Sequence, residues 1–177
     1  DVYVNDILVG SHTGGYAPFS IDITPALKKG AKQLLTVRVT DPTDTQKHPI
    51  GKQRQEPKGI WYTSVSGIWQ TVWIEPVAKE NRILNIKPVG DVFKCELHID
   101  TDCATNEGIV EIELFDGGTK VATAKSLCGT RTTIILPDAK EWTPETPFLY
   151  DMTVTLKKAG KVVDKVSSYA AMRTVDV

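Results

Sequence analysis

The stretch GIWYTSVSGIWQTVWIEP, residues 59–76, holds three of the four tryptophans of the chain and ends on a proline. From Trp69 onward the residues alternate, with Trp69, Thr71 and Trp73 on one face, and this pattern predicts a β-strand. Pro76 ends the strand because proline has no N–H to donate to a ladder. We expect these rings to fill the core of a β-sandwich. The alternative is that one or more of them line a sugar site, since flat apolar rings match the C–H faces of pyranoses.

Length and composition limit the classes of protein. The chain has 177 residues, enough for one domain or two small ones, and its 41% apolar content supports a packed core. The net charge of −1 gives no electrostatic basis for binding nucleic acid, and no apolar run approaches the ~20 residues of a membrane span. The chain opens inside a strand and turn at Asp1 to Asp6, so we expect a piece of a longer protein.

Residues 79–177 have the pattern of an immunoglobulin-like β-sandwich. Short alternating segments are separated by turn residues such as Asp116-Gly117-Gly118 and Ala159-Gly160. We expect about seven strands, at residues 83–89, 93–99, 109–115, 120–124, 132–136, 150–156 and 161–169. The fold class is therefore all-β, with very little helix.

The sequence of residues 1–78 predicts fewer strands and helices than that of residues 79–177. Val2–Val4 and Ile7–Gly10 flank Asn5-Asp6 as a hairpin, and residues 35–40 alternate as a strand. Thr24 to Gly30 predicts a short helical turn, with Thr24 as the N-cap. We expect Tyr16 and Phe19 to plug the sandwich. The pattern disappears from Asp41 to Lys58, and because long structureless loops in compact domains are usually functional, we take residues 41–66 as the functional edge.

The three cysteines, Cys95, Cys103 and Cys128, have no metal-binding spacing. Cys95 alternates with Leu97 and Ile99, which predicts that it faces the core. We expect free thiols and leave one disulfide open, because spacing alone does not reveal a pairing.

Four motifs, in order along the chain, resemble glycoside hydrolase family 2, the family of bacterial β-galactosidases, β-glucuronidases and β-mannosidases. The motifs are HTGGYAPF at 12–19, SGI at 66–68, EWTPETPFLY at 141–150, and VD at 163–164 followed by SYAAMRTV at 168–175. The resemblance covers nearly the whole chain and is strongest to the β-galactosidase-like members. It implies an all-β chain in which residues 1–78 are the C-terminal part of a sugar-binding-like jelly-roll sandwich and 79–177 the immunoglobulin-like domain. It also implies that the catalytic (β/α)8 barrel would begin at Asp176-Val177 and is absent.

Catalysis in such enzymes needs two carboxyl groups about 5–5.5 Å apart. In the family both come from the barrel, so the resemblance implies no catalytic residue here and no hydrolase activity of this chain alone. Glu111 and Glu113 are predicted to face solvent, and Asp41 and Asp44 to make turn bonds.

The sequence also predicts no metal site and no cofactor. The three histidines, His12, His48 and His98, are far apart. Asp100-Thr101-Asp102 lacks a following glycine-rich loop and predicts a solvated turn rather than a calcium site.

The candidate substrate-binding residues are Trp61, Tyr62, Gln53 and Arg54. In some relatives an Asp several residues before the SGI turn contacts the sugar, and the matching place near Trp61 has no carboxylate. We therefore expect these four side chains to reach toward sugar instead, against the alternative that they pack at a domain interface.

Three functions remain open from the sequence. The first is a non-catalytic fragment of a retaining hydrolase of terminal β-glycosides, with carbohydrate and the missing barrel in cis as partners. The second is a free-standing carbohydrate-binding module with an immunoglobulin-like spacer, and the third a pair of structural β-domains without a ligand. We expect no nucleic-acid or membrane partner, self-association through residues 1–77, and a bacterial periplasmic or cytoplasmic location.

Overall fold

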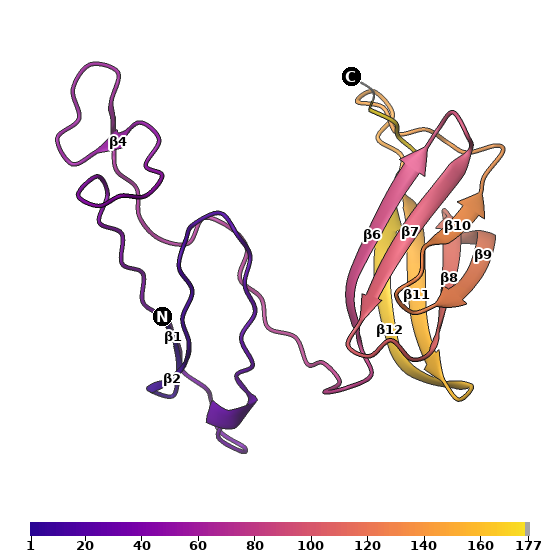
Figure 1. Cartoon of the computed structure of the whole chain (residues 1–177), viewed down its shortest axis with the longest axis horizontal. Coiled ribbons are helices and arrows are strands. Elements are labelled where there is room, and N and C mark those ends of the chain that lie inside the picture. The colour runs from indigo at the N-terminus through magenta and orange to yellow at the C-terminus, as the bar shows by residue number, and fades with distance from the viewer. Residues whose placement is uncertain (176–177) are drawn as a thin grey trace. The chain divides into compact units, whose positions relative to one another are not determined.

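The computed structural model describes residues 1–175 as two compact units, of which the first is Asp1–Ile74 and the second begins at Glu75 (Figure 1). The expected start of a barrel at Asp176-Val177 lies outside the described residues. The regular elements of residues 1–175 are strands apart from one 3-10 turn, so the all-β prediction is confirmed. No helix within residues 1–175 is long and apolar enough to cross a membrane.

The second unit is a sandwich of two antiparallel sheets, seen as two layers in Figure 1. Its three-stranded sheet has the order β10-β7-β6, and its four-stranded sheet the order β12-β11-β8-β9. The strands are β6 (Ile83–Asp91), β7 (Glu96–Cys103), β8 (Ile109–Asp116), β9 (Thr119–Leu127), β10 (Thr132–Ile135), β11 (Tyr150–Lys158) and β12 (Lys161–Ala170). The predicted number of seven strands is confirmed, and most ran longer than their patterns indicated.

The core of the second unit follows the period-two pattern of its strands. Side chains from β7 and β8 alternate between burial and the outward face, as the sequence predicted, and those from β11 do so except at Thr155, which is also buried. The fully buried members are Leu97, Ile99, Val110, Ile112, Leu114, Val154 and Leu156, each 0% exposed. Glu111 and Glu113 face outward between them, because successive side chains of a strand point to opposite faces.

The connections were also predictable. Gly117 and Gly118, with φ of 54° and 88°, turn the chain between β8 and β9, and Ala159-Gly160 do the same between β11 and β12. Two-residue hairpin turns need positive φ, which glycine adopts without a steric penalty.

The Trp142 to Pro147 segment connects the end of β12 with the start of β11 at one end of the sandwich. Trp142 and Pro147 pair as an isolated bridge, and the Trp142 N–H donates to the Met172 carbonyl at 2.9 Å. At the base, the buried Tyr150 hydroxyl accepts a hydrogen bond from the Lys140 N–H at 2.7 Å.

The prediction of free thiols is wrong for two of the three cysteines. Cys103 and Cys128 form a disulfide with their Cα atoms 6.3 Å apart. The expectation for Cys95 is also wrong in detail, because this half-buried free thiol lies in the turn before β7, with φ of 55°, outside the strand alternation. Sequence spacing does not show that the ends of β7 and β9 meet, which is why the pair was missed.

The first unit is built on a three-stranded sheet of order β2-β1-β3. Its strands are β1 (Val2–Val4), β2 (Ile7–Gly10) and β3 (Leu35–Val37). Asn5 and Asp6 have φ of 52° and 67°, so the predicted hairpin turn is confirmed. A 3-10 turn, η1 (Thr24–Ala26), replaces the expected helical turn, and its cap is Ile23 rather than Thr24. The Thr24 N–H is instead met by the Asp22 carboxylate at 2.9 Å.

The predicted strand at residues 69–74 does not form, and the prediction that its tryptophans fill a core is wrong. Trp69 and Trp73 are 67% and 69% exposed. A strand needs a neighbour to complete its ladder, and within residues 1–74 the described sheets give this segment no such neighbour. The Trp69 indole N–H donates to the Gly15 carbonyl at 2.8 Å instead.

Tyr16 and Phe19 also differ from the prediction that they plug a core. They are 74% and 50% exposed, and Phe19 stacks on His12 with ring centroids 4.4 Å apart. The described boundary at Ile74/Glu75 lies close to the predicted one at residue 78, while the assignment of residues 1–78 to part of a jelly roll stays a prediction.

We predict that Leu114→Ala lowers the free energy of unfolding by about 2–5 kcal/mol, because it leaves a cavity in a fully buried site. Leu127→Ala is the matched control, since Leu127 is 64% exposed in the same sheet, and we expect a loss below about 1 kcal/mol. Urea unfolding followed by circular dichroism measures both. Equal losses for the two variants would contradict the described core.

Candidate functional site

The four predicted sugar-contacting residues lie together in the first unit. Gln53 and Arg54 form β4 (Gln53–Arg54), and Tyr62 begins β5 (Tyr62–Thr63), which directly follows Trp61. The two strands pair in parallel, with Gln53 opposite Tyr62, and the Tyr62 N–H donates to the Lys52 carbonyl at 2.9 Å. The structure therefore brings residues from both ends of a connecting loop to one place.

Arg54 and Trp61 form the centre of this cluster. The guanidinium carbon lies 4.0 Å from the centroid of the indole, within the range of a cation–π contact. The Asp44 carboxylate lies 3.8 Å from the Arg54 Nε, so the stacked guanidinium has a counter-charge on its edge. Trp61 is 38% exposed and Tyr62 is 64% exposed, which leaves aromatic surface available to a ligand.

Gln53 and Lys52 complete the polar surroundings of the rings. The Gln53 side-chain carbonyl accepts a hydrogen bond from the Val65 N–H at 2.6 Å, which ties β4 to the segment after β5. Its amide nitrogen then offers N–H groups to a ligand hydroxyl. The Lys52 ammonium lies 5.9 Å from the Tyr62 ring centroid.

Asp41 places a carboxylate at Ser66, the first residue of the SGI turn, and not at the place near Trp61 where the sequence lacks one. One carboxylate oxygen accepts from the Thr43 N–H at 2.8 Å, and the other accepts from the Ser66 hydroxyl at 3.0 Å. The Thr43 N–H, followed by the Ser66 hydroxyl, lowers the pKa of the Asp41 carboxyl against the opposing effect of desolvation. The group is therefore held as the anion.

Asp41 and Asp44 both make contacts beyond the turn bonds that the sequence predicted. The turn bond of Asp41 to Thr43 is confirmed, but Asp41 also reaches Ser66, 25 positions along the chain. Asp44, assigned to a turn bond, pairs with Arg54 instead. In the sequence, only the lack of a strand or helix pattern in residues 41–58 pointed to this loop. The contacts of Asp41 and Asp44 join residues distant along the chain, so no local motif records them.

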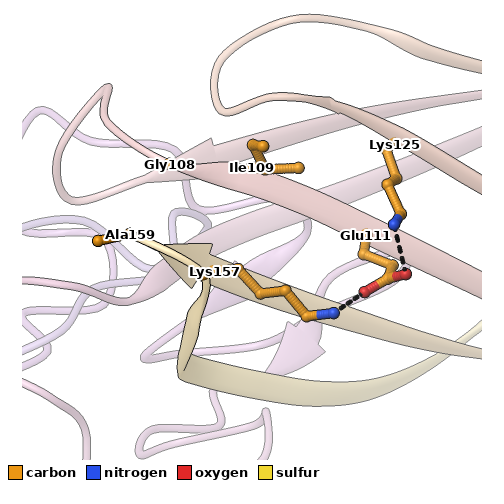
Figure 2. A pocket seen from close by; sticks show the side chains of 7 residues that line it. Gly108, Ile109, Glu111, Lys125, Lys157 and Ala159 are labelled. Atoms are coloured by element: carbon orange, nitrogen blue, oxygen red, sulfur yellow. Dashed lines mark hydrogen bonds and ion pairs between the residues drawn. The ribbon is translucent and has the colours of Figure 1, made fainter.

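Figure 2 shows the pocket on the outward face of the second unit, about 260 Å³ in volume and lined by Gly108, Ile109, Glu111, Lys125, Lys157, Ala159 and Gly160. The Glu111 carboxylate lies between two ammonium groups. One of its oxygens is 3.1 Å from the Lys125 Nζ, and the other forms an ion pair with the Lys157 Nζ. Lys157, followed by Lys125, lowers the pKa of Glu111. A glycosidase acid needs a raised pKa, so Glu111 is poorly suited to donate a proton.

Asp100-Thr101-Asp102 is not the predicted solvated turn, because these residues lie inside β7. The Asp100 carboxylate accepts two hydrogen bonds from Arg131, both at 2.8 Å, and Thr101 is buried. Within residues 1–175 no group of three or more His, Cys, Asp or Glu side chains is placed to hold a metal ion.

Comparison with known proteins shows what this chain is similar to. Residues 93–173 match the model of the family described as Glycosyl hydrolases family 2. The chain is 27% identical to a beta-galactosidase of Thermoanaerobacter pseudethanolicus, over 99% of this chain and 24% of that protein. It is 28% identical to a putative beta-glucuronidase of Formosa agariphila, over 98% of this chain and 21% of that protein. The resemblance to glycoside hydrolase family 2 is therefore confirmed.

Solved structures with similarity include the β-glucuronidase from Ruminococcus gnavus in complex with D-glucuronic acid. That structure matches with a TM-score of 0.46 and 18% identity, over 55% of this chain and 17% of the other. The chain thus spans only about a quarter of the length of the curated relatives that it matches.

We predict that Ser66→Ala raises the pKa of Asp41 part of the way toward its ordinary value of 3.8, because one of the two hydrogen bonds to the anion is lost. A lowered pKa stabilises the fold above the ordinary value, and this contribution is lost as the pH falls through the folded-state pKa. The variant should therefore lose part of the acid resistance of this loop. Carboxyl-carbon NMR titration measures the pKa, with Ser64→Ala as the control, and an unchanged Asp41 would refute the assignment.

Proposed function

We propose that this chain supplies two non-catalytic β-domains of a retaining family 2 glycoside hydrolase that cleaves terminal β-glycosides, β-galactosides in the first place. Support comes from similarity that runs along almost the whole chain, while covering only 21–24% of a beta-galactosidase and a putative beta-glucuronidase. Those two relatives are larger proteins that carry much more than the part matched here.

The observation that carries the site proposal is the Arg54–Trp61 stack beside the Gln53–Tyr62 strand pair. Exposed aromatic faces suit the C–H face of a pyranose. The guanidinium and the Gln53 amide supply donors, and the Asp41 carboxylate supplies an acceptor for sugar hydroxyls. We propose that these groups form one wall of the sugar site and orient the terminal residue.

Bond cleavage itself is proposed to belong to a catalytic barrel in cis. Direct attack needs a nucleophilic carboxylate and an acid about 5–5.5 Å apart, the acid having a raised pKa. Glu111 and Glu113, the paired carboxylates of this chain, are instead ion-paired with lysines on an outward face. The chain alone is therefore expected to be inactive, and the second unit to act as a rigid spacer.

A carbohydrate-binding module is the second candidate, and the exposure of Trp61 and Tyr62 favours it. Such a module binds sugar without any catalytic partner. The two functions make different predictions for the full-length protein. Only the glycosidase proposal predicts hydrolysis when the barrel is present.

The deciding experiment compares nitrophenyl β-galactoside, β-glucuronide and β-mannoside as substrates of this chain and of the full-length enzyme to which we assign it. We expect hydrolysis only by the full-length enzyme, because the reacting carboxylates are proposed to lie in the barrel. Hydrolysis by the chain alone would refute the proposal, and sugar binding with no hydrolysis by either protein would favour the binding module.

We predict that Trp61→Ala in the active full-length enzyme raises KM by about tenfold, about 1.4 kcal/mol, with little change in kcat, because the ring is proposed to bind the ground and transition states equally. Trp73→Ala is the control, since Trp73 is an exposed tryptophan (69%) that is not among the candidate sugar-contacting residues. Steady-state kinetics on the preferred glycoside measures both. An unchanged KM for Trp61→Ala would remove this residue from the site.

We further propose that the isolated chain associates with a second copy through its first unit. The edge strands β2 and β3 carry exposed apolar side chains, with Ile7 and Leu8 at 53% and 54% exposure and Leu35 at 39%. Unpaired strand edges with apolar side chains invite strand addition.

Leu8→Lys is expected to reduce this association, because a lysine on a strand edge opposes pairing. Sedimentation velocity over a range of concentrations measures the oligomeric state. Leu149→Lys is the control, since Leu149 is 45% exposed in the second unit. A wild-type chain that stays monomeric at all concentrations would contradict the proposal.

A further inference from the structure

The Cys103–Cys128 disulfide joins the two sheets of the second unit. Cys103 is the last residue of β7 in the three-stranded sheet, and Cys128 directly follows β9 in the four-stranded sheet. The two cysteines are separated by 25 positions along the chain and are only 9% and 5% exposed. The bond is therefore a buried cross-link between layers.

The backbone around the bond is held from both layers. The Cys128 N–H donates to the Gly108 carbonyl at 3.1 Å, next to the start of β8, and the Gly129 N–H donates to the Thr101 carbonyl of β7 at 3.1 Å. β9 and β10 are edge strands of different sheets, joined nearby by a hydrogen bond between the Thr132 and Ser126 hydroxyls at 2.7 Å. The disulfide thus ties β7, the central strand of the three-stranded sheet, to the segment after β9, an edge strand of the four-stranded sheet.

The third cysteine is too far away to compete for this pairing. Cys95 precedes β7 and Cys103 ends it, so at about 3.3 Å per residue the two lie roughly 26 Å apart. Disulfides require Cα atoms within about 7 Å, and the Cys103–Cys128 pair meets this limit at 6.3 Å. Cys95 remains a thiol, whose sulfur lies 3.7 Å from the Val92 carbonyl.

We infer that this protein matures in an oxidising compartment, where the Cys103–Cys128 bond forms and then holds the second unit in its folded state. Disulfides form and persist in secreted and periplasmic proteins and are rare in a reducing cytosol. Two thiols lose two protons and two electrons to a reactive protein disulfide, which is itself reduced to two thiols. Once the sandwich has closed, burial of both sulfurs excludes attacking thiolates.

The bond should also set the redox dependence of stability. Its removal releases a constraint on the unfolded chain and unlinks β7 from the segment after β9. We expect the melting temperature of the second unit to fall by about 10 °C or more when the bond is absent. The inference does not rest on the proposed glycosidase function, and no part of its test measures hydrolysis.

The first measurement is a non-reducing tryptic map of the full chain exported to a bacterial periplasm. The expected result is residues 95–120 linked to residues 126–131, and one free thiol per denatured chain. Cys95→Ser should keep the link, whereas Cys103→Ser should abolish it. Three free thiols in the exported wild-type chain would overturn the inference, whatever the stability of the variants.

The second measurement compares melting with and without a reductant. The wild-type chain and Cys95→Ser should lose stability on reduction, and Cys103→Ala/Cys128→Ala should melt at the lower temperature in both conditions. Protein kept in a reducing cytosol should resemble the double variant. Equal melting of oxidised and reduced wild-type chain, or full oxidation in the reducing cytosol, would refute the dependence on an oxidising compartment.

Discussion

The facing apolar rows of β7, β8 and β11 are the interaction on which the second unit depends. Leu97 and Ile99 from one sheet meet Ile112, Leu114 and Leu156 of the core cluster from the other, and none is exposed to solvent. The ladder registers follow from this, because a slip of one residue would move each row to the solvent side. The apolar packing sets the arrangement of the two sheets. The turns, the Trp142 to Pro147 segment and the disulfide add further stability to this arrangement.

The first unit is held together by a different balance of forces. Its fully buried apolar side chains are few, chiefly Val4 and Ala26, and its aromatic cluster rests on polar contacts. Arg54 stacks on Trp61, Asp44 neutralises Arg54, and Gln53 ties the segment to the Val65 backbone. Such contacts fix the orientation of the aromatic and polar side chains, whereas they add less stability than an apolar core of the same extent.

Features that depend on consecutive residues could be predicted from the sequence, whereas features that depend on contacts between distant segments could not. Alternation in residues 109–115 and 150–156 predicted both strands and their buried faces, because the period of a strand is written in consecutive residues. The pairing of Cys103 with Cys128 and of Asp41 with Ser66 depends on segments 25 positions apart, which no local pattern records. The strand expected at residues 69–74 failed for the same reason, since alternation predicts a face but supplies no neighbouring strand.

The parallel pairing of β4 with β5 has a consequence for how this surface changes during evolution. Parallel neighbours cannot be joined by a tight hairpin, so residues 55–61 must return along the pair before β5 begins. Pro57 and the left-handed Gly59, with φ of 60°, shape that return, and it delivers Trp61 beside Arg54. Insertions or deletions in the return segment would therefore reposition the indole while the two-residue ladder stays in register. Changes in loop length would thus move the Trp61 ring of the proposed sugar site without altering the packing of the second unit.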